Sequence, residues 1–334
     1  MKEDLKAVGV YIATLVGAGF ASGSEIVFYF VRYGKMSIMA IFLASFLFSV
    51  FAVAILRFSR YNNLNSFSDF LIRVFGERLS KPLNIAVYFF IFAVFCAMIS
   101  GSAESLFDAF GLKRGLGALL TVLAVFFVLI FDSKGLSAVD GIISILIFIG
   151  ILCISFYLYT FREIPVFKNE SKMLASGAMY AGYNMLTAGG VLAGFAPKVS
   201  SPRRVGAVSG VIIFVLLSLL WGIISIYYGK IPLGELPMLT ICRRHGDLIY
   251  FSYFAVLFMA MLSTAISNAY LLANIGQGRR IIRLFFVSVS GFLMSGFPLD
   301  FFVDKVYRAV GILGFFIMAI IFIKNFKKSN LLEK

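Results

Sequence analysis

The chain has 334 residues, of which 61% are hydrophobic and 16% aromatic, and its mean hydropathy of +0.97 indicates an integral membrane protein that crosses the bilayer several times. The formal net charge of +14 is divided among short gaps between apolar runs, which argues against a nucleic-acid-binding surface. The three cysteines, Cys96, Cys153 and Cys242, lack the spacing of a disulfide framework or a metal site.

The first apolar run covers residues 7–33 and contains the stretch Val16-Gly17-Ala18-Gly19-Phe20-Ala21-Ser22-Gly23. Each glycine costs roughly 1 kcal/mol relative to alanine in a helix. Non-helical backbone at membrane depth is tolerated only where it is packed in protein or lines a cavity. We therefore expect residues 17–23 to interrupt the first helix at a binding site.

A helix that stops and restarts inside the bilayer presents carbonyl groups at the first end and N–H groups at the second. The carbonyl end suits a cation and the N–H end suits an anion. The first half is expected to end near residues 13–16 and the second to begin near residues 21–24. An amino acid would meet both polarities. The expected solute-binding residues here are Gly17, Ala18, Gly19, Phe20, Ala21, Ser22 and Gly23.

Ten apolar runs are long enough to cross the bilayer, because about 20 residues span a ~30 Å hydrocarbon core as a helix. They cover residues 7–33, 36–56, 82–109, 115–131, 140–161, 173–196, 205–228, 248–275, 281–297 and 303–323. Two connections, 61–81 and 230–247, can hold short helices. Clusters of arginine and lysine at 57–81, 279–283 and 324–328 favour a cytoplasmic position for both termini.

The chain also contains an internal repeat. One register aligns residues 95–100 with 258–263 and residues 18–20 with 181–183, and it carries the first five spans onto the second five. Five is an odd number, so the second copy enters the membrane from the opposite side. An inverted repeat with interrupted helices at corresponding places is typical of secondary transporters that bind solute near the midplane.

The repeat predicts a second interruption in the sixth span, at Tyr180-Ala181-Gly182-Tyr183-Asn184. In this interpretation Tyr180, Gly182, Tyr183 and Asn184 face the first break, and Ser100 of the third span joins them as a solute-binding residue. The alternative is that the small residues serve close helix packing, which is common in membranes.

Ten spans in two inverted copies, with glycine-rich breaks in the first and sixth, resemble the amino acid–polyamine–organocation superfamily with the fold of the sodium-coupled leucine transporter. More narrowly, the run Gly17-Ala18-Gly19-Phe20-Ala21-Ser22-Gly23-Ser24-Glu25-Ile26 is similar to the signature of the bacterial YkvI-like membrane proteins. The resemblance implies an all-α protein with repeats at 1–163 and 164–324 and a cytoplasmic tail at 325–334. It also implies the bacterial cytoplasmic (inner) membrane as the location.

Sodium-coupled members hold a cation between carbonyls of the first helix and two hydroxyls of the eighth span. Carried onto this sequence, the resemblance implies a candidate Na⁺ site formed by Ala13, Val16, Ala260, Ser263 and Thr264. Serine and threonine also join helices in membranes without binding an ion, which is the alternative for the hydroxyls.

Two acidic residues within the spans are proton-coupling candidates, because ionisable groups at membrane depth are by default functional hypotheses. Glu25 follows the first break and Glu104 lies late in the third span. The alternative places both at the outer interface, with Glu104 close to Asp108 and Glu25 near Arg32. Sodium and proton coupling therefore both stay open.

The sequence contains neither a Walker-type phosphate loop nor a grouping of His, Cys and Asp suited to hydrolysis, and its loops are too short for a soluble catalytic domain. We expect no enzymatic activity and no cofactor besides Na⁺. The predicted function is secondary transport of a small zwitterionic solute, an amino acid, by alternating access within the lipid bilayer. The alternative is a transporter-like sensor or complex subunit that binds solute without moving it. Which protein partners the chain has, if any, does not follow from the sequence.

Overall fold

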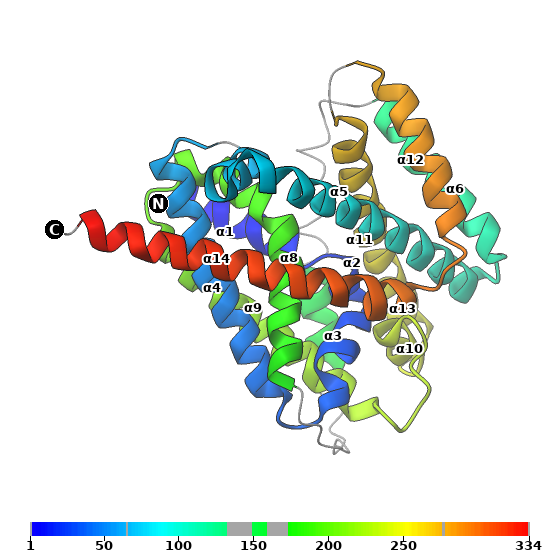
Figure 1. Ribbon diagram of the computed structural model, residues 1–334. Helices are drawn as coiled ribbons and strands as arrows, with labels where there is room; N and C mark the ends of the chain where they lie inside the picture. The colour runs from blue at the N-terminus through cyan, green and yellow to red at the C-terminus, as the bar shows by residue number, and fades with distance from the viewer. Residues whose placement is uncertain (1, 65, 132–148, 159–172, 276–277, 333–334) are drawn as a thin grey trace.

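The computed structural model describes residues 2–64, 66–131, 149–158, 173–275 and 278–332, and these are nearly all helical (Figure 1). The helices are α1 (Lys2–Leu15), α2 (Ala18–Ser22), α3 (Ser24–Tyr29), η1 (Val31–Tyr33), α4 (Ser37–Tyr61), α5 (Phe67–Phe110), α6 (Arg114–Phe131), Ile149–Leu158, α8 (Met173–Phe195), η2 (Ala196–Lys198), α9 (Pro202–Tyr227), α10 (Pro237–Arg243), α11 (Asp247–Ala273), α12 (Arg280–Met294), α13 (Leu299–Phe301), the π-helix η3 (Phe302–Tyr307) and α14 (Arg308–Leu332).

Five of these helices are long and apolar enough to cross a membrane. They are Ser37–Tyr61, Phe67–Phe110, Pro202–Tyr227, Asp247–Ala273 and the run Leu299–Lys324. Arg114–Ile130 and Ile149–Leu158 are shorter apolar helices. The expected span at 140–161 lies mostly outside the described residues. In α5 the left-handed Gly76 (φ 80°) kinks the helix, which joins the predicted short helix at 61–81 to the third span.

The first apolar run is divided into three short helices. Gly17 is extended (φ −81°, ψ −175°) between α1 and α2, and Gly23 is left-handed (φ 81°, ψ −6°) between α2 and α3. Only glycine adopts the second conformation without strain. A side chain at Gly23 would also meet Ile224 and Met238. The backbone therefore changes direction twice, at two glycines of the stretch 17–23.

The sixth span differs from the prediction of a break at residues 180–184, which is wrong. Helix α8 runs without interruption from Met173 to Phe195. Its glycines serve close packing: a Cβ on Gly182 would overlap the carbonyl oxygen of Gly311, and one on Gly314 would overlap that of Gly182. Because glycine lets two membrane helices approach to backbone contact, Gly182 marks the crossing of α8 and α14 and leaves the α8 hydrogen bonds intact.

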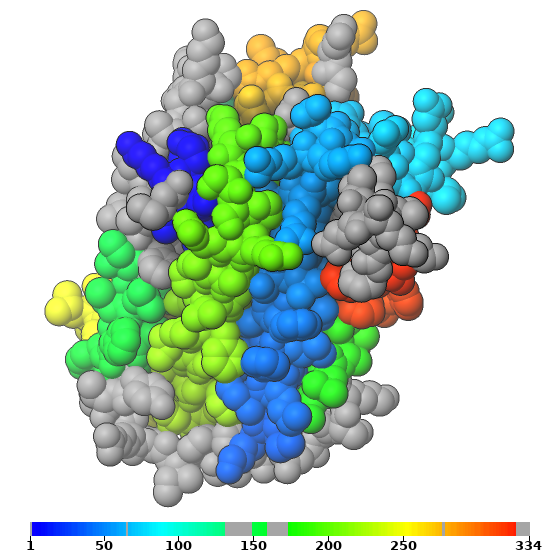
Figure 2. Space-filling model, turned by 90° about the vertical axis from the view of Figure 1, so that its left-hand side faces the viewer, coloured from blue at the N-terminus to red at the C-terminus, as the bar shows by residue number. Residues whose placement is uncertain are grey.

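Two groups of helices share most of the packing. Helix α4 packs on α8 and α9, and α1 packs on the same two helices. Figure 2 shows α4 and α9 as adjacent blue and yellow-green columns on one face. Helix α5 packs on α6, α11 and α12, while α14 crosses α8. Helix α2 contacts α11, and Tyr253 of α11 donates a hydrogen bond to the Ala21 carbonyl (2.5 Å). The divided first run therefore lies where the two groups meet.

Candidate functional site

Glu25 lies in the first turn of α3, directly after the left-handed Gly23. Its residue surface is only 6% exposed. The carboxyl group turns back over α2, so that a Cβ built on Gly19 would overlap Oε1 and lie 2.6 Å from Cδ of Glu25. The missing side chain of Gly19 is therefore what makes room for the carboxylate beside the interrupted backbone.

Four buried tyrosines surround this position, and we call them the tyrosine cluster: Tyr29 of α3, Tyr180 and Tyr183 of α8, and Tyr307 of η3. The ring centroids of Tyr29, Tyr180 and Tyr183 are each 5.5 Å apart. Tyr307 lies 5.2 Å from Tyr183. These separations are those of rings in direct contact.

The polar atoms of this cluster have few partners. Within the described part of the chain, the hydroxyls of Tyr29 and Tyr307 are buried without a hydrogen-bond partner, whereas those of Tyr180 and Tyr183 interact with the Glu25 carboxylate. Glu25 has no cationic partner there either, although its charge interacts electrostatically with all four phenol groups. Buried polar groups without partners are costly, so a set of them around one carboxylate indicates a site that a ligand completes.

The π-helix η3 supplies the fourth tyrosine. It covers Phe302–Tyr307, immediately before α14, and ends on Tyr307. Single π turns are rare in helices and are frequent at functional sites. On the α8 side, the hydroxyl of Ser176 donates to the Tyr29 carbonyl (2.8 Å) and fastens α3 to α8.

Three predicted polar residues use their side chains within the protein. The amide of Asn184 donates to the Tyr180 carbonyl (3.0 Å), and the Ser22 hydroxyl donates to the Gly19 carbonyl (2.9 Å). Ser100 donates to the Phe297 carbonyl (2.7 Å), which ties α5 to the chain between α12 and α13. All three are buried.

The candidate sodium residues lie on both sides of α2. Ala13 is in the last turn of α1 and Val16 directly follows α1, with its N–H donating to the Ile12 carbonyl (2.8 Å). Ala260, Ser263 and Thr264 are in α11, with the two hydroxyl residues half-buried. The sodium site stays a prediction.

Glu104 is placed in a different environment from Glu25. It forms an ion pair with Arg114 (2.5 Å), which also pairs with Glu235 (3.0 Å). Glu235 in turn accepts a hydrogen bond from the backbone N–H of Leu299 (2.7 Å). Glu104 therefore belongs to a network of charges that joins α5, α6 and the start of α13, apart from the tyrosine cluster.

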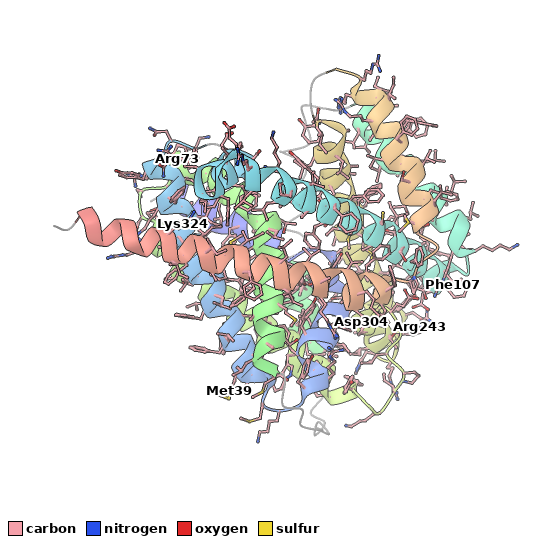
Figure 3. All side chains as sticks on the ribbon, in the orientation of Figure 1. Met39, Arg73, Phe107, Arg243, Asp304 and Lys324 are labelled. Carbon is pink, nitrogen blue, oxygen red and sulfur yellow. The ribbon has the colours of Figure 1, made fainter. Side chains whose placement is uncertain are left out.

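A cavity of about 430 Å³ lies between α3 and the α13–η3 segment, and we call it the α3–α13 cavity. Its lining includes Ser24, Phe28, Asp300, Asp304 and Lys305. The hydroxyl of Ser24 donates to Oδ1 of Asp300 (3.0 Å) and so bridges α3 to α13. In Figure 3 the labelled Asp304 lies near the start of the η3–α14 run and Lys324 lies towards its other end, and Asp304 lines the cavity.

The beginning of α1 is fastened to the loop before α9. Asp4 accepts hydrogen bonds from the backbone N–H and the hydroxyl of Ser200, both at 2.7 Å. The hydroxyl donor lowers the pKa of the Asp4 carboxyl from its ordinary value, although burial acts in the opposite direction. Arg60 of α4 donates to the carbonyls of Val199 and Ser200 (3.1 and 3.2 Å). This contact joins α1, α4 and α9.

Sequence reasoning missed Tyr29 and Tyr307. Tyr29 follows Glu25 by four residues, so the two share a helix face, and this spacing could have identified it. Tyr307 had no comparable signal, because its position depends on the π-helix.

The chain is similar to two proteins of Bacillus subtilis and to a solved transporter structure. No family model matches. The chain is 24% identical over 269 residues to the uncharacterized membrane protein YkvI of Bacillus subtilis, covering 78% of this chain and 77% of the relative. It is 22% identical over 277 residues to the uncharacterized protein YyaD of the same organism, covering 80% and 79%. A crystal structure of a mutant manganese transporter of Eremococcus coleocola aligns with a TM-score of 0.49 at 14% identity. The alignment covers 92% of this chain and 68% of the transporter chain. The predicted resemblance to YkvI-like proteins is confirmed.

Proposed function

We propose that this multi-pass membrane protein is a secondary transporter that moves a small ammonium-bearing solute, such as an amino acid, by alternating access. The observation that carries the proposal is the buried Glu25 carboxylate beside the interrupted first helix. Four buried tyrosines surround it, and the hydroxyls of Tyr29 and Tyr307 have no partner among the residues that the structure describes. Solute sites at membrane depth are formed where irregular backbone and polar groups are buried in protein. The α3–α13 cavity is the approach to this site.

In this proposal the ten spans form two inverted five-helix repeats, 1–163 and 164–324. The packing supports it, because α1, α4, α8 and α9 form one group, with α14 packed on α8, and α5, α6, α11 and α12 form another, with α2 in contact with α11. One group moves relative to the other and exposes Glu25 to each side in turn. Of the two spans expected to be interrupted, the first is divided and the sixth, α8, is continuous. Both termini are in the cytoplasm, which puts the Asp4–Ser200 contact inside and the α3–α13 cavity outside.

Coupling is to H⁺ at Glu25 or to Na⁺ at the predicted site of Ala13, Val16, Ala260, Ser263 and Thr264. Na⁺ is a hard cation that oxygen ligands suit, and the hydroxyls and carbonyls of this set are of that type. Replacing Ser263 and Thr264 by alanine removes the Na⁺ dependence of uptake if this site is used. Uptake that keeps its Na⁺ dependence in the double variant excludes it.

The function is tested by uptake of labelled amino acids and amines into proteoliposomes. Gly19→Leu abolishes uptake, because its side chain takes the space of the Glu25 carboxylate. The matched control is Gly9→Leu, since Gly9 is in α1 with open space around its Cβ position. Equal loss in both variants contradicts the assignment of the site. Binding without accumulation in wild-type protein identifies a sensor instead.

A further inference from the structure

Glu25 is a buried carboxylate, and no lysine or arginine pairs with it among the residues that the structure describes. An isolated charge in a low-dielectric interior is costly unless it is neutralised. Two agents can neutralise it, a proton on the carboxyl group or a cation beside it. Either one must be present whenever the site is closed to water.

Among the described residues, the charged and titratable groups around Glu25 do not supply the positive charge that would neutralise its carboxylate. From α8, η3 and its own helix it meets only the phenols of the tyrosine cluster. Arg308 of α14 pairs with Asp304 of η3 (3.1 Å), and Arg32 of η1 lies over the ring of Phe28 (3.8 Å). Cys96 of α5 faces Tyr307, while α2 carries no titratable group and α9 presents Ile224.

We propose that Glu25 binds the proton and the ammonium group of the solute alternately, so that the two compete for one carboxylate and are exchanged one for one. This deepens the proposed function, on which it rests. Binding is then R–NH₃⁺ + Glu25–COOH → R–NH₃⁺···⁻OOC–Glu25 + H⁺, and the released proton enters the water on the side to which the site is open. No oxidant or other reactant is needed.

The tyrosine hydroxyls fit this ligand. An ammonium group has three donors and no acceptor, whereas a carboxylate and phenol oxygens all accept. The hydroxyls of Tyr29 and Tyr307 lack a partner among the described residues, so they are available, and those of Tyr180 and Tyr183 are directed at Glu25 itself. The rings of Tyr29, Tyr180 and Tyr183 touch at 5.5 Å, which leaves no room for a cation between them. The ammonium group therefore binds on the hydroxyl side, next to Glu25.

The test is proton release on binding, measured with a pH indicator dye in weakly buffered detergent solution. The probes are n-butylammonium, norvaline and n-butanol, of which the first two share an ammonium group and the third has none. At acidic pH each bound amine releases about one proton, and its Kd rises about tenfold for each unit that the pH falls. Butanol releases none.

Glu25→Gln keeps the shape of the side chain and removes its charge, so it abolishes proton release and the pH dependence of binding. Glu77→Gln is the control, because Glu77 is exposed on α5. Thermal unfolding shows whether each variant is folded. If Glu25→Gln does not fold, Tyr29→Phe replaces it: binding weakens several-fold while about one proton is still released per ligand.

Wild-type protein that binds either amine without releasing a proton overturns the inference, as does a Kd that is constant with pH. Wild-type protein that binds neither amine overturns it as well. In each of these cases, uptake of another solute into proteoliposomes leaves the proposed function standing. Absence of uptake for every solute contradicts the proposed function itself.

Discussion

At the scale of single residues, Gly19 leaves the space that the Glu25 carboxylate occupies. The glycine could be predicted as part of a break, since three glycines in seven positions disfavour a helix, and Glu25 could be predicted as an ionisable group at membrane depth. The direction of the Glu25 side chain could not be predicted, because this direction depends on where α8 and η3 place their tyrosines. The sequence also indicated Glu104 as a second candidate, and the structure separates the two by showing the ion pair of Glu104 with Arg114.

Removal of one hydroxyl from the tyrosine cluster separates binding from stability. Tyr307→Phe leaves the unfolding free energy within about 0.5 kcal/mol of wild type, because this hydroxyl has no partner among the described residues. Solute binding weakens by about 1 kcal/mol, or several-fold. The control is Tyr253→Phe, which loses the hydrogen bond to Ala21 and about 1 kcal/mol of stability. Thermal shift with and without solute measures both effects, and a strongly destabilised Tyr307→Phe contradicts the assignment.

Asp4 gives stability a dependence on pH. The pKa of this carboxyl is lowered in the folded protein, so its contribution is complete above the unfolded value of about 3.9 and is lost as the pH falls through the folded value. Asp4→Asn therefore costs on the order of 1 kcal/mol at neutral pH, and the difference from wild type narrows in acid. Thermal unfolding at a series of pH values measures it. Glu3→Gln is the exposed neighbouring control, and a gap that widens in acid would show that the sign is wrong.

At the scale of helices, the hydropathy pattern predicted positions well and continuity poorly. Apolar length locates a span because the bilayer sets it. Glycines in a span can interrupt the helix or allow close packing against a neighbouring helix. Which of the two occurs depends on the position of that neighbour, and a single sequence does not reveal it. The first run breaks at Gly17 and Gly23, whereas in α8 the same residue type lies against the backbone of α14.

Two glycines of α8 respond oppositely to alanine. Gly182→Ala destabilises by about 1–3 kcal/mol, because a methyl group there overlaps the Gly311 carbonyl. Gly190→Ala is neutral or stabilises by up to about 1 kcal/mol, since its Cβ would lie 3.8 Å from the nearest contact and alanine favours a helix. Unfolding in detergent measures both. Equal effects would show that the α8–α14 crossing is not as close as described.

At the scale of the whole molecule, alternating access requires the two packing groups to move relative to each other. The inverted repeat could be proposed from the order of the spans, yet the groups themselves follow from contacts that the sequence does not reveal. The bridge from Ser24 to Asp300 joins α3, which packs on α8 and α9 of the first group, to α13, which contacts α5 of the second group. The contact from Asp4 to Ser200 lies within the first group.

Cross-linking tests this motion. Cysteines at Ser24 and Asp300, in a protein whose three native cysteines are replaced by alanine, arrest uptake when they are oxidised, and a reductant restores it. The same pair of substitutions at Asp4 and Ser200 leaves uptake intact, because α1 and α9 move together. Proteoliposome uptake before and after oxidation measures the effect. Uptake that continues with α3 tied to α13 contradicts the proposed motion.

The π-helix before α14 carries one residue more per turn than an α-helix would hold. Deleting a single residue there would convert the π turn into an ordinary α-helical turn and leave the helix on either side in nearly the same register. Because Gly311 and Gly314 hold the later part against α8, the change would be confined to the turn itself, which ends on Tyr307. A chain shortened by that one residue is expected to keep its fold and to lose the fourth phenol of the tyrosine cluster.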